Sequence, residues 1–182
     1  MIAPNTAHRL TLGPYQDRDA PALAEWLSDR WLLLSLYPQS LQPPALAKVL
    51  ADWRSPPSGL GDWQFAVWLQ DQRLIGCVRL ERRQLSYFLG RPYWAQGLGG
   101  RVLGLVTAEL RDSQPGALVR AQVARDNLAS CRVLQRNGFT FSGIVPGPSR
   151  LHCVHEYAYR VDGPVPASLP AEEQEQSAVD RR

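Results

Sequence analysis

The chain has 182 residues, of which 45% are hydrophobic, and its 20 basic and 17 acidic residues leave a formal net charge of +3. This length and composition predict one soluble globular domain that is large enough to form a hydrophobic core. No apolar run reaches the ~18 residues of a membrane-spanning helix, and the basic residues are too scattered to form a nucleic-acid-binding stripe. We therefore expect neither a membrane nor a nucleic acid as a partner.

The three cysteines, Cys77, Cys131 and Cys153, are widely spaced and lack Cys-x-x-Cys spacing. Neither a disulfide framework nor a zinc site is predicted from them, and no metal is expected. Residues 1–12 lack a basic region followed by an apolar one, which is the pattern of a secretory signal. Together, these features predict a cytoplasmic protein with reduced thiols.

The first third of the chain predicts a strand followed by two helices. Residues 9–12 are expected to form the strand. Asp19 and Pro21 provide a cap and a first-turn proline for the first helix. Its apolar face consists of Leu23, Trp26 and Leu27. The proline pair 43–44 precedes the second helix, whose apolar stripe consists of Leu46, Val49, Leu50 and Trp53.

Strand patterns dominate the remainder of the chain. Residues 63–69 and 74–80 alternate around a polar turn, which predicts an antiparallel hairpin. Further strands are predicted at residues 85–89, 118–123, 139–144 and 151–160. From Asp162 the composition shifts to Pro, Glu, Gln, Ser and Ala. We therefore expect one domain over residues 1–162 and a disordered tail over residues 163–182.

A glycine-rich turn stands between strand 85–89 and a segment with helical apolar spacing. Gly97, Gly99 and Gly100 lie in this turn. A turn of this kind leaves backbone N–H groups unpaired at the positive end of the helix dipole, where a diphosphate can approach closely. The spacing matches neither a nucleotide-hydrolysing P-loop nor a dinucleotide-binding fingerprint.

A second segment follows at residues 123–139. It contains the end of a strand, an Asn127 helix cap, a helical segment and a Gly138 stop before the next strand.

Together, the two segments resemble the GNAT superfamily of acetyl-CoA-dependent N-acetyltransferases. Its cofactor motif is Gln/Arg-x-x-Gly-x-Gly/Ala, which Gly97 and Gly99 match, whereas Trp94 stands at the leading position. The second segment is similar to the branch that includes the ribosomal-protein N-terminal acetyltransferases. The residues that match its motif are Asn127, Ser130, Val133, Leu134, Gly138 and Phe139. The order of elements matches from about residue 9 to residue 161.

The resemblance implies an α+β GNAT fold, with a mixed, largely antiparallel sheet of about six or seven strands and helices on both faces. It also implies that strand 85–89 splays from the next strand and offers the backbone of Phe88 and Leu89 to the pantetheine arm of acetyl-CoA. The pyrophosphate is then expected at the glycine turn. The residues implied there are Gln96, Gly97, Leu98, Gly99, Gly100 and Arg101.

Two residues of the second motif have implied roles. Asn127 is expected to cap the helix and to hydrogen-bond the pantetheine arm. Many superfamily members use a tyrosine as general acid at the position of Leu134, which cannot donate a proton. Either Ser130 donates a hydrogen bond and a proton to the coenzyme sulfur, or water does.

The general base is less specified by the sequence. A carboxylate is often placed before the glycine motif, where this chain has Gln84. Glu81, His155 and Glu156 remain as candidates, and His155 is named as the candidate catalytic base. Alternatively, the bound amine loses its proton through water.

In the family, the acceptor pocket is built by the early helices and by the segment 31–41, which we expect to be irregular. Trp31 and Tyr37 are the predicted lining residues. The predicted function is transfer of an acetyl group from acetyl-CoA to a primary amine, either a protein N-terminus or a small molecule. The alternative is a non-catalytic acyl-CoA-binding or regulatory module on the same fold. The protein is expected to be a monomer or a homodimer.

Overall fold

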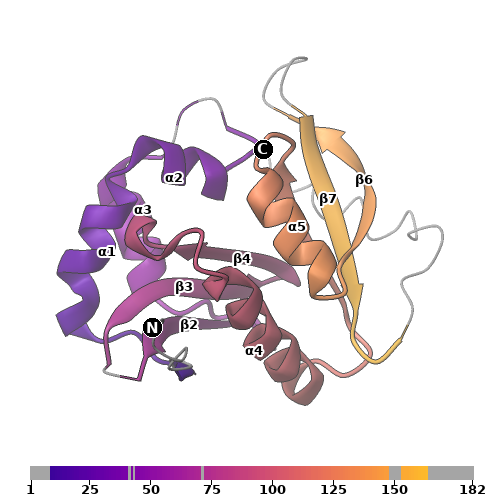
Figure 1. The fold of residues 1–182 in the computed structure, drawn as a ribbon, viewed down its shortest axis with the longest axis horizontal. Coiled ribbons are helices and arrows are strands. Elements are labelled where there is room, and N and C mark those ends of the chain that lie inside the picture. Colours follow the sequence, from indigo (N-terminus) through magenta and orange to yellow (C-terminus); the bar gives the residue numbers. More distant parts are fainter. Residues whose placement is uncertain (1–8, 41, 43, 71, 148–152, 164–182) are drawn as a thin grey trace, which may run out of the picture.

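The computed structural model describes residues 9–40, 42, 44–70, 72–147 and 153–163. A seven-stranded sheet in the order β1-β2-β3-β4-β5-β7-β6 forms its centre (Figure 1). The strands are β1 (Leu10–Gly13), β2 (Trp63–Leu69), β3 (Leu74–Glu81), β4 (Gln84–Leu89), β5 (Leu118–Ala124), β6 (Thr140–Pro146) and β7 (Cys153–Arg160). The β4–β5 pair is parallel and the other neighbouring pairs are antiparallel. The predicted α+β fold is therefore confirmed.

Helices cover both faces of the sheet. They are α1 (Ala20–Leu27), α2 (Arg30–Leu36), α3 (Leu46–Arg54), α4 (Leu98–Ser113) and α5 (Leu128–Arg136), with two short 3-10 turns, η1 (Asp17–Asp19) and η2 (Arg91–Tyr93). The first three helices pack through one apolar cluster, and α4 and α5 pack through another. Among the described helices, none is long and apolar enough to cross a membrane.

The alternation of side chains along β4 assigns its residues to the two faces. Phe88 belongs to the cluster under α1–α3, whereas Leu85 and Leu89 belong to the cluster under α4 and α5. Phe88 meets the Trp53 ring edge-to-face, with centroids 5.0 Å apart. Each face of this central strand is therefore covered by apolar side chains.

One expected element is wrong. The segment 31–41 was expected to be irregular, but α2 occupies Arg30–Leu36. Asp29 caps it, since its Oδ1 accepts hydrogen bonds from the N–H groups of Trp31 (2.9 Å) and Leu32 (3.4 Å). The leucine-rich run behind this cap has good helix formers and no β-branched residue, so a helix forms.

The other boundaries shift by a few residues. The second predicted helix begins at Leu46, after an Ala45 cap, rather than directly at the proline pair. The predicted strand 151–160 is described from Cys153 onward, because residues 151 and 152 lie outside the described part of the chain. The predicted tail lies outside it as well, beyond Gly163.

Two neighbouring strands separate along their length. The β4–β5 ladder has two registered pairs, Gln84 with Arg120 and Leu85 with Ala121. A backbone hydrogen bond from Arg120 N–H to the Arg83 carbonyl (2.9 Å) closes the same end. From Ser86 onward no pair is registered between these strands in the described structure. As expected, β4 and β5 are therefore neighbours in the sheet, and they splay apart beyond Leu85.

Candidate active site

The splay leaves one edge of β4 without a partner strand. Backbone N–H and C=O groups alternate in direction along a strand, and the Arg83 carbonyl points to β5. The groups of Tyr87 and Leu89 therefore point to the same side. The Leu89 carbonyl accepts the Trp94 indole N–H at 2.7 Å. This leaves the Tyr87 backbone and the Leu89 N–H along the open edge.

The same alternation does not bring Phe88 to the gap. Its backbone groups face β3, where it is paired with Cys77, and its side chain is 3% exposed. Of the two predicted residues, Leu89 therefore has a backbone group at the gap and Phe88 does not, and the Tyr87 backbone lies there as well. Sequence reasoning missed Tyr87, because the direction of backbone groups depends on pairing with β5.

The glycine turn opens α4 as expected. Gly97 is the N-cap and has φ 73°, and Ala95 two residues earlier has φ 58°. This left-handed backbone suits glycine and turns the chain sharply into the helix. The first N–H groups of α4, on Leu98, Gly99 and Gly100, lack carbonyl partners within the helix. They therefore offer unpaired donors at the helix N-terminus, which is the kind of group that anions bind, beside the open edge of β4.

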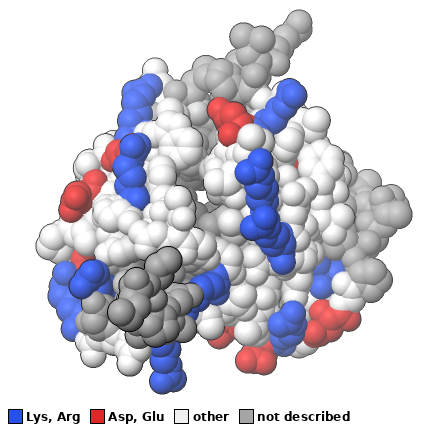
Figure 2. Space-filling model, viewed as in Figure 1, with Lys and Arg blue, Asp and Glu red and all other residues white. Residues whose placement is uncertain are grey.

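The space around this terminus lies between α4, α5 and the end of β4. A Cβ added at Gly99 would stand 3.6 Å from Val133 Cγ2 and 4.0 Å from Leu89 Cδ1. At Gly100 the nearest atom would be Asn137 Nδ2, at 3.9 Å. A Cβ at either glycine would therefore make only ordinary van der Waals contacts, with α5 or with the end of β4. Figure 2 shows a hollow near the middle of this face, with basic side chains on both sides of it.

Two further residues of the predicted cofactor site lie at the surface. Gln96 is exposed, and its amide donates to the Pro92 carbonyl at 2.6 Å within the same turn. Arg101 is exposed on the first turn of α4. Leu98 is 5% exposed and packs into the core, so its N–H rather than its side chain is available to a ligand.

Asn127 caps α5 and is coupled to Ser130. The Asn127 Oδ1 accepts the Ser130 backbone N–H at 3.2 Å, as the sequence predicts. This cap uses the oxygen of the amide, so the Nδ2 group remains for a ligand carbonyl. Ser130 is half-buried beside the Tyr87 hydroxyl, on the α5 side of the sheet.

His155 and Glu156 lie on opposite faces of β7. His155 pairs with Val123, which belongs to the α4 and α5 cluster, and its ring packs on Phe141 with centroids 5.2 Å apart. Glu156 pairs with Gln122 and points to the other face. The structure therefore gives His155 an aromatic packing role and does not bring it to the cavity on the α2 side.

An open cavity of about 260 Å³ lies on the α2 side of the splay. It is lined by Leu36, Tyr37, Pro38, Gln39, Ser40, Gln84, Ser86 and Gln122. Tyr37, one of the two predicted lining residues, is present. Burial raises the pKa of its phenol, so the phenol stays protonated at neutral pH. The lining therefore combines hydroxyl and amide groups with apolar walls.

Trp31, the other predicted lining residue, does not reach this cavity. It lies on α2, is 50% exposed, and meets the Trp94 ring with centroids 5.5 Å apart. The Arg91 guanidinium stacks on the same Trp94 ring, 5.2 Å from its centroid. Its Nε also donates a hydrogen bond to Asp29 Oδ2 at 2.7 Å. These contacts hold α2 onto the turn before α4.

A series of side-chain hydrogen bonds connects two residues of the cavity lining, Gln39 and Gln122, to Glu156. Gln39 Nε2 donates to Gln122 Oε1 at 2.6 Å, and Gln122 Nε2 donates to Glu156 Oε1 at 3.1 Å. Arg120 lies 3.7 Å from the other Glu156 oxygen. Because a carboxylate only accepts, Glu156 fixes the Gln122 amide with its oxygen toward the cavity. Sequence reasoning missed Gln39 and Gln122, which come from distant parts of the chain.

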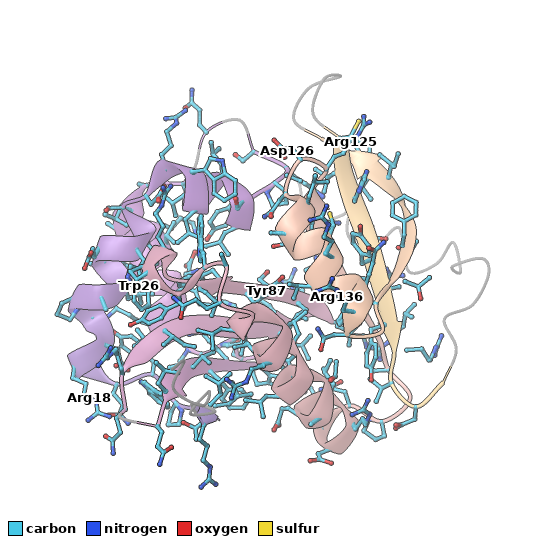
Figure 3. All side chains as sticks on the ribbon, viewed as in Figure 1. Arg18, Trp26, Tyr87, Arg125, Asp126 and Arg136 are labelled. Carbon is cyan, nitrogen blue, oxygen red and sulfur yellow. The ribbon has the colours of Figure 1, made fainter. Side chains whose placement is uncertain are left out.

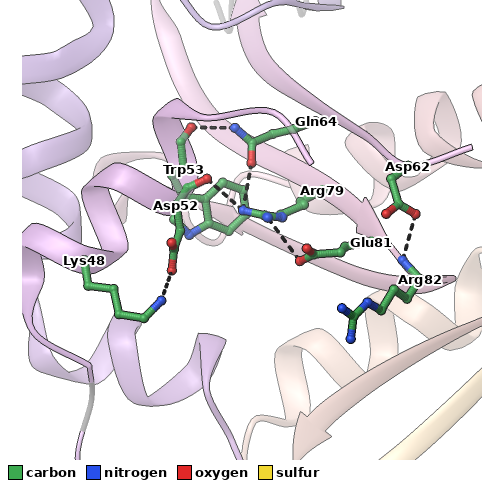
Figure 4. A network of polar contacts seen from close by, with 8 residues as sticks. All are labelled: Lys48, Asp52, Trp53, Asp62, Gln64, Arg79, Glu81 and Arg82. Carbon is green, nitrogen blue, oxygen red and sulfur yellow. Dashed lines mark hydrogen bonds and ion pairs between the residues drawn. The ribbon is translucent and has the colours of Figure 1, made fainter. Parts of the chain in front are cut away.

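Glu81, another candidate base, belongs to a separate network (Figure 4). It is 48% exposed and lies 3.1 Å from Arg79 Nη2. Arg79 also donates to the Asp52 carbonyl (2.7 Å), and Lys48 pairs with the Asp52 carboxylate (2.8 Å). This network ties α3 to β3. Within the described residues, no group of three His, Cys, Asp or Glu side chains could hold a metal.

Comparisons with known proteins agree with this arrangement. A family model described as "Acetyltransferase (GNAT) domain" matches residues 9–140. The comparison with curated protein sequences finds no match.

Several solved structures share the fold. A spermidine N-acetyltransferase from Vibrio cholerae, in complex with CoA and spermine, is 14% identical, with 84% of this chain and 95% of that chain covered and a TM-score of 0.66. An acetyl transferase from Salmonella typhimurium that modifies the N-terminal serine of ribosomal protein L7/L12 is 20% identical, with 84% and 95% covered and a TM-score of 0.62. A structure of RimL, the ribosomal L7/L12 alpha-N-protein acetyltransferase, is 19% identical, with 87% and 93% covered and a TM-score of 0.63.

Proposed function

The chain belongs to the GNAT acetyltransferase family, and we propose that it transfers the acetyl group of acetyl-CoA to a primary amine. The observation that carries this proposal is the splay of β4 and β5 beside the glycine-lined start of α4. A strand edge and an anion-binding helix terminus lie side by side there, and they suit the two parts of the acyl donor.

The donor is proposed to lie along both features. The first N–H groups of α4 bind the pyrophosphate. The pantetheine amides hydrogen-bond the Tyr87 backbone and the Leu89 N–H, as an added strand would. Asn127 Nδ2 donates to a carbonyl of the same arm. This placement brings the thioester to the gap between β4 and β5, next to Ser130.

The amine is proposed to approach from the opposite face, through the cavity under α2. Its N–H donates to Gln122 Oε1, which Glu156 holds in place. Gln122 stands between the cavity and Glu156, so we assign the departing proton to solvent rather than to a carboxylate.

The reaction replaces the C–S bond with a C–N bond, while the amine proton leaves to solvent and the sulfur gains a proton. The amine nitrogen bonds to the thioester carbon, the C–S bond breaks, and the sulfur keeps its electron pair. The Ser130 hydroxyl donates a hydrogen bond to the sulfur as negative charge develops, and then gives it a proton that solvent restores. Ser130→Ala is expected to lower kcat by about a hundredfold, with nearly unchanged affinity for acetyl-CoA.

The proposed acceptors are ordered by the lining of the cavity. Hydroxyl and amide groups suit the backbone of a peptide N-terminus, so peptides come first, followed by polyamines and aminoglycosides. The experiment measures release of the coenzyme A thiol from acetyl-CoA with each class. Thiol release that depends on an added amine supports the proposed acetyl transfer. Tight acetyl-CoA binding with no release for any amine would favour the alternative, a non-catalytic acyl-CoA-binding module.

A further inference from the structure

A buried phenol beside the gap has no hydrogen-bond partner. Among the described side chains, the Tyr87 hydroxyl oxygen is excluded from solvent and unpaired, although part of its ring is exposed. Leaving a polar group buried and unpaired costs free energy, so such a group calls for an explanation. The mechanism above does not use this hydroxyl.

The phenol projects from β4 toward the start of α5. Tyr87 lies two residues beyond the last registered β4–β5 pair, and in Figure 3 it lies between β4 and α5. The Ser130 hydroxyl is its neighbour: it is close enough to oppose the effect of burial on the Tyr87 pKa, but the two groups do not meet hydrogen-bond geometry. Cys131, the other polar neighbour, raises the pKa of the Tyr87 phenol and also that of the Tyr157 phenol.

We propose that Tyr87 is a positioning residue for Ser130, donating its O–H to Ser130 Oγ once acetyl-CoA occupies the gap, so that the Ser130 proton is directed at the sulfur. The proposal rests on the proposed function and adds a residue to it. This hydrogen bond gives the buried Tyr87 hydroxyl a partner and uses one of the two lone pairs of Ser130 Oγ. The single hydroxyl hydrogen of Ser130 is then left for the ligand.

The direction of this hydrogen bond follows from acidity. A phenol is a stronger donor than an aliphatic hydroxyl, so Tyr87 donates and Ser130 accepts. Burial raises the pKa of Tyr87 to about 12, so its proton is present throughout the neutral range. Tyr87 therefore polarises Ser130 without giving up its own proton, and no charged phenolate has to form in the buried site.

The test compares Tyr87→Phe with Tyr157→Phe, which removes a second phenol from the same cluster. We expect Tyr87→Phe to lower kcat about tenfold, to leave the KM for acetyl-CoA unchanged, and not to lower the melting temperature. Tyr157→Phe should keep the parental kcat. The double variant Tyr87→Phe, Ser130→Ala should be no slower than Ser130→Ala alone, because both changes act through one hydroxyl.

A parental kcat in Tyr87→Phe overturns the proposal, and so do additive losses in the double variant. A kcat loss accompanied by a lower melting temperature also overturns it, since that combination indicates a structural role.

A second measurement separates this proposal from the proposed function. The ultraviolet absorbance of the thiolate gives the thiol pKa of bound coenzyme A. We expect a thiol pKa below that of free coenzyme A in the parent, and a value about one unit higher in Tyr87→Phe than in the parent. If no amine is acetylated, the proposed function fails but this titration still decides the role of Tyr87. Equal thiol pKa values in parent and variant overturn the positioning role even in an active enzyme.

Discussion

Asn127 has two roles that can be separated by substitution. Its Oδ1 caps α5 and its Nδ2 is proposed to hold the pantetheine arm. Asn127→Ala is expected to lower the free energy of unfolding by ~1 kcal/mol and to weaken acetyl-CoA binding.

Asn127→Asp is the matched control. Aspartate caps a helix about as well but has no N–H to donate, so we expect parental stability with weakened binding. Calorimetric titration and thermal melts measure the two quantities. An Asp variant that binds acetyl-CoA like the parent would limit Asn127 to capping.

Glu156 is expected to act on the acceptor rather than on the acyl donor. Glu156→Gln allows the Gln122 amide to rotate, because a glutamine at position 156 both donates and accepts. We expect the KM for the amine to rise several-fold while the acetyl-CoA affinity is unchanged.

His155→Phe provides the comparison for Glu156→Gln, since it keeps an aromatic ring against Phe141 and removes the imidazole. We expect kcat at the parental value, measured by thiol release at saturating amine. A large kcat loss in His155→Phe, with parental melting, would support His155 as the catalytic base.

At the scale of elements, the start of α4 gives the sharpest test of the donor site. A Gly97→Val change would add backbone strain at φ 73°, so Gly99→Val is the cleaner variant. Its side chain would extend toward Val133 and Leu89, beside the first N–H groups of α4. We expect acetyl-CoA affinity to fall about tenfold or more.

Gly104→Val controls for the helix itself. Gly104 lies on α4, and its Cβ would be 3.9 Å from Asn137 Oδ1, in ordinary contact. The two variants place the same residue type in the same helix, and only Gly99→Val lies in the first turn, where the diphosphate is proposed to bind. Equal affinities in calorimetry would place the diphosphate elsewhere.

Local signals predicted most of the elements. The hairpin of β2 and β3 follows from strand alternation around a polar turn, and α5 follows from its Asn127 cap and Gly138. The irregular segment predicted over residues 31–41 was wrong, although Asp29 offered a cap signal before the leucine run.

The candidate site was less predictable, because its geometry depends on pairing between distant segments. Whether His155 or Glu156 faces the cavity is set by the register of β7 on β5. Gln39 and Gln122 meet across 83 positions of the sequence. The Tyr87 backbone points into the gap only because β4 pairs with β5 at Gln84 and Leu85. None of these relations has a local sequence signal.

At the scale of the whole molecule, the tail is expected to be dispensable. Val161 is 1% exposed, and its N–H donates to the Ala117 carbonyl at 2.9 Å, so the packed chain extends at least to that residue. Residues 164–182 have a composition that cannot bury enough apolar surface to fold on its own. A truncation after Gly163 should keep the parental melting temperature and acetyl-CoA affinity. A marked loss of either would show that the tail docks on the domain.

The short ladder between β4 and β5 also has a mechanical consequence. Within the sheet, two registered pairs at one end join strands β1–β4 to strands β5–β7, and one apolar cluster under α4 and α5 spans both groups of strands. A donor molecule bound along the open end is expected to contact both groups of strands and to stabilise their separation. The backbone amides of Tyr87 and Leu89, which face the gap, should therefore exchange hydrogen more slowly when coenzyme A is bound, whereas the β2–β3 hairpin should be unaffected. We thus expect the donor to stabilise the free edge of β4 more than any other part of the sheet.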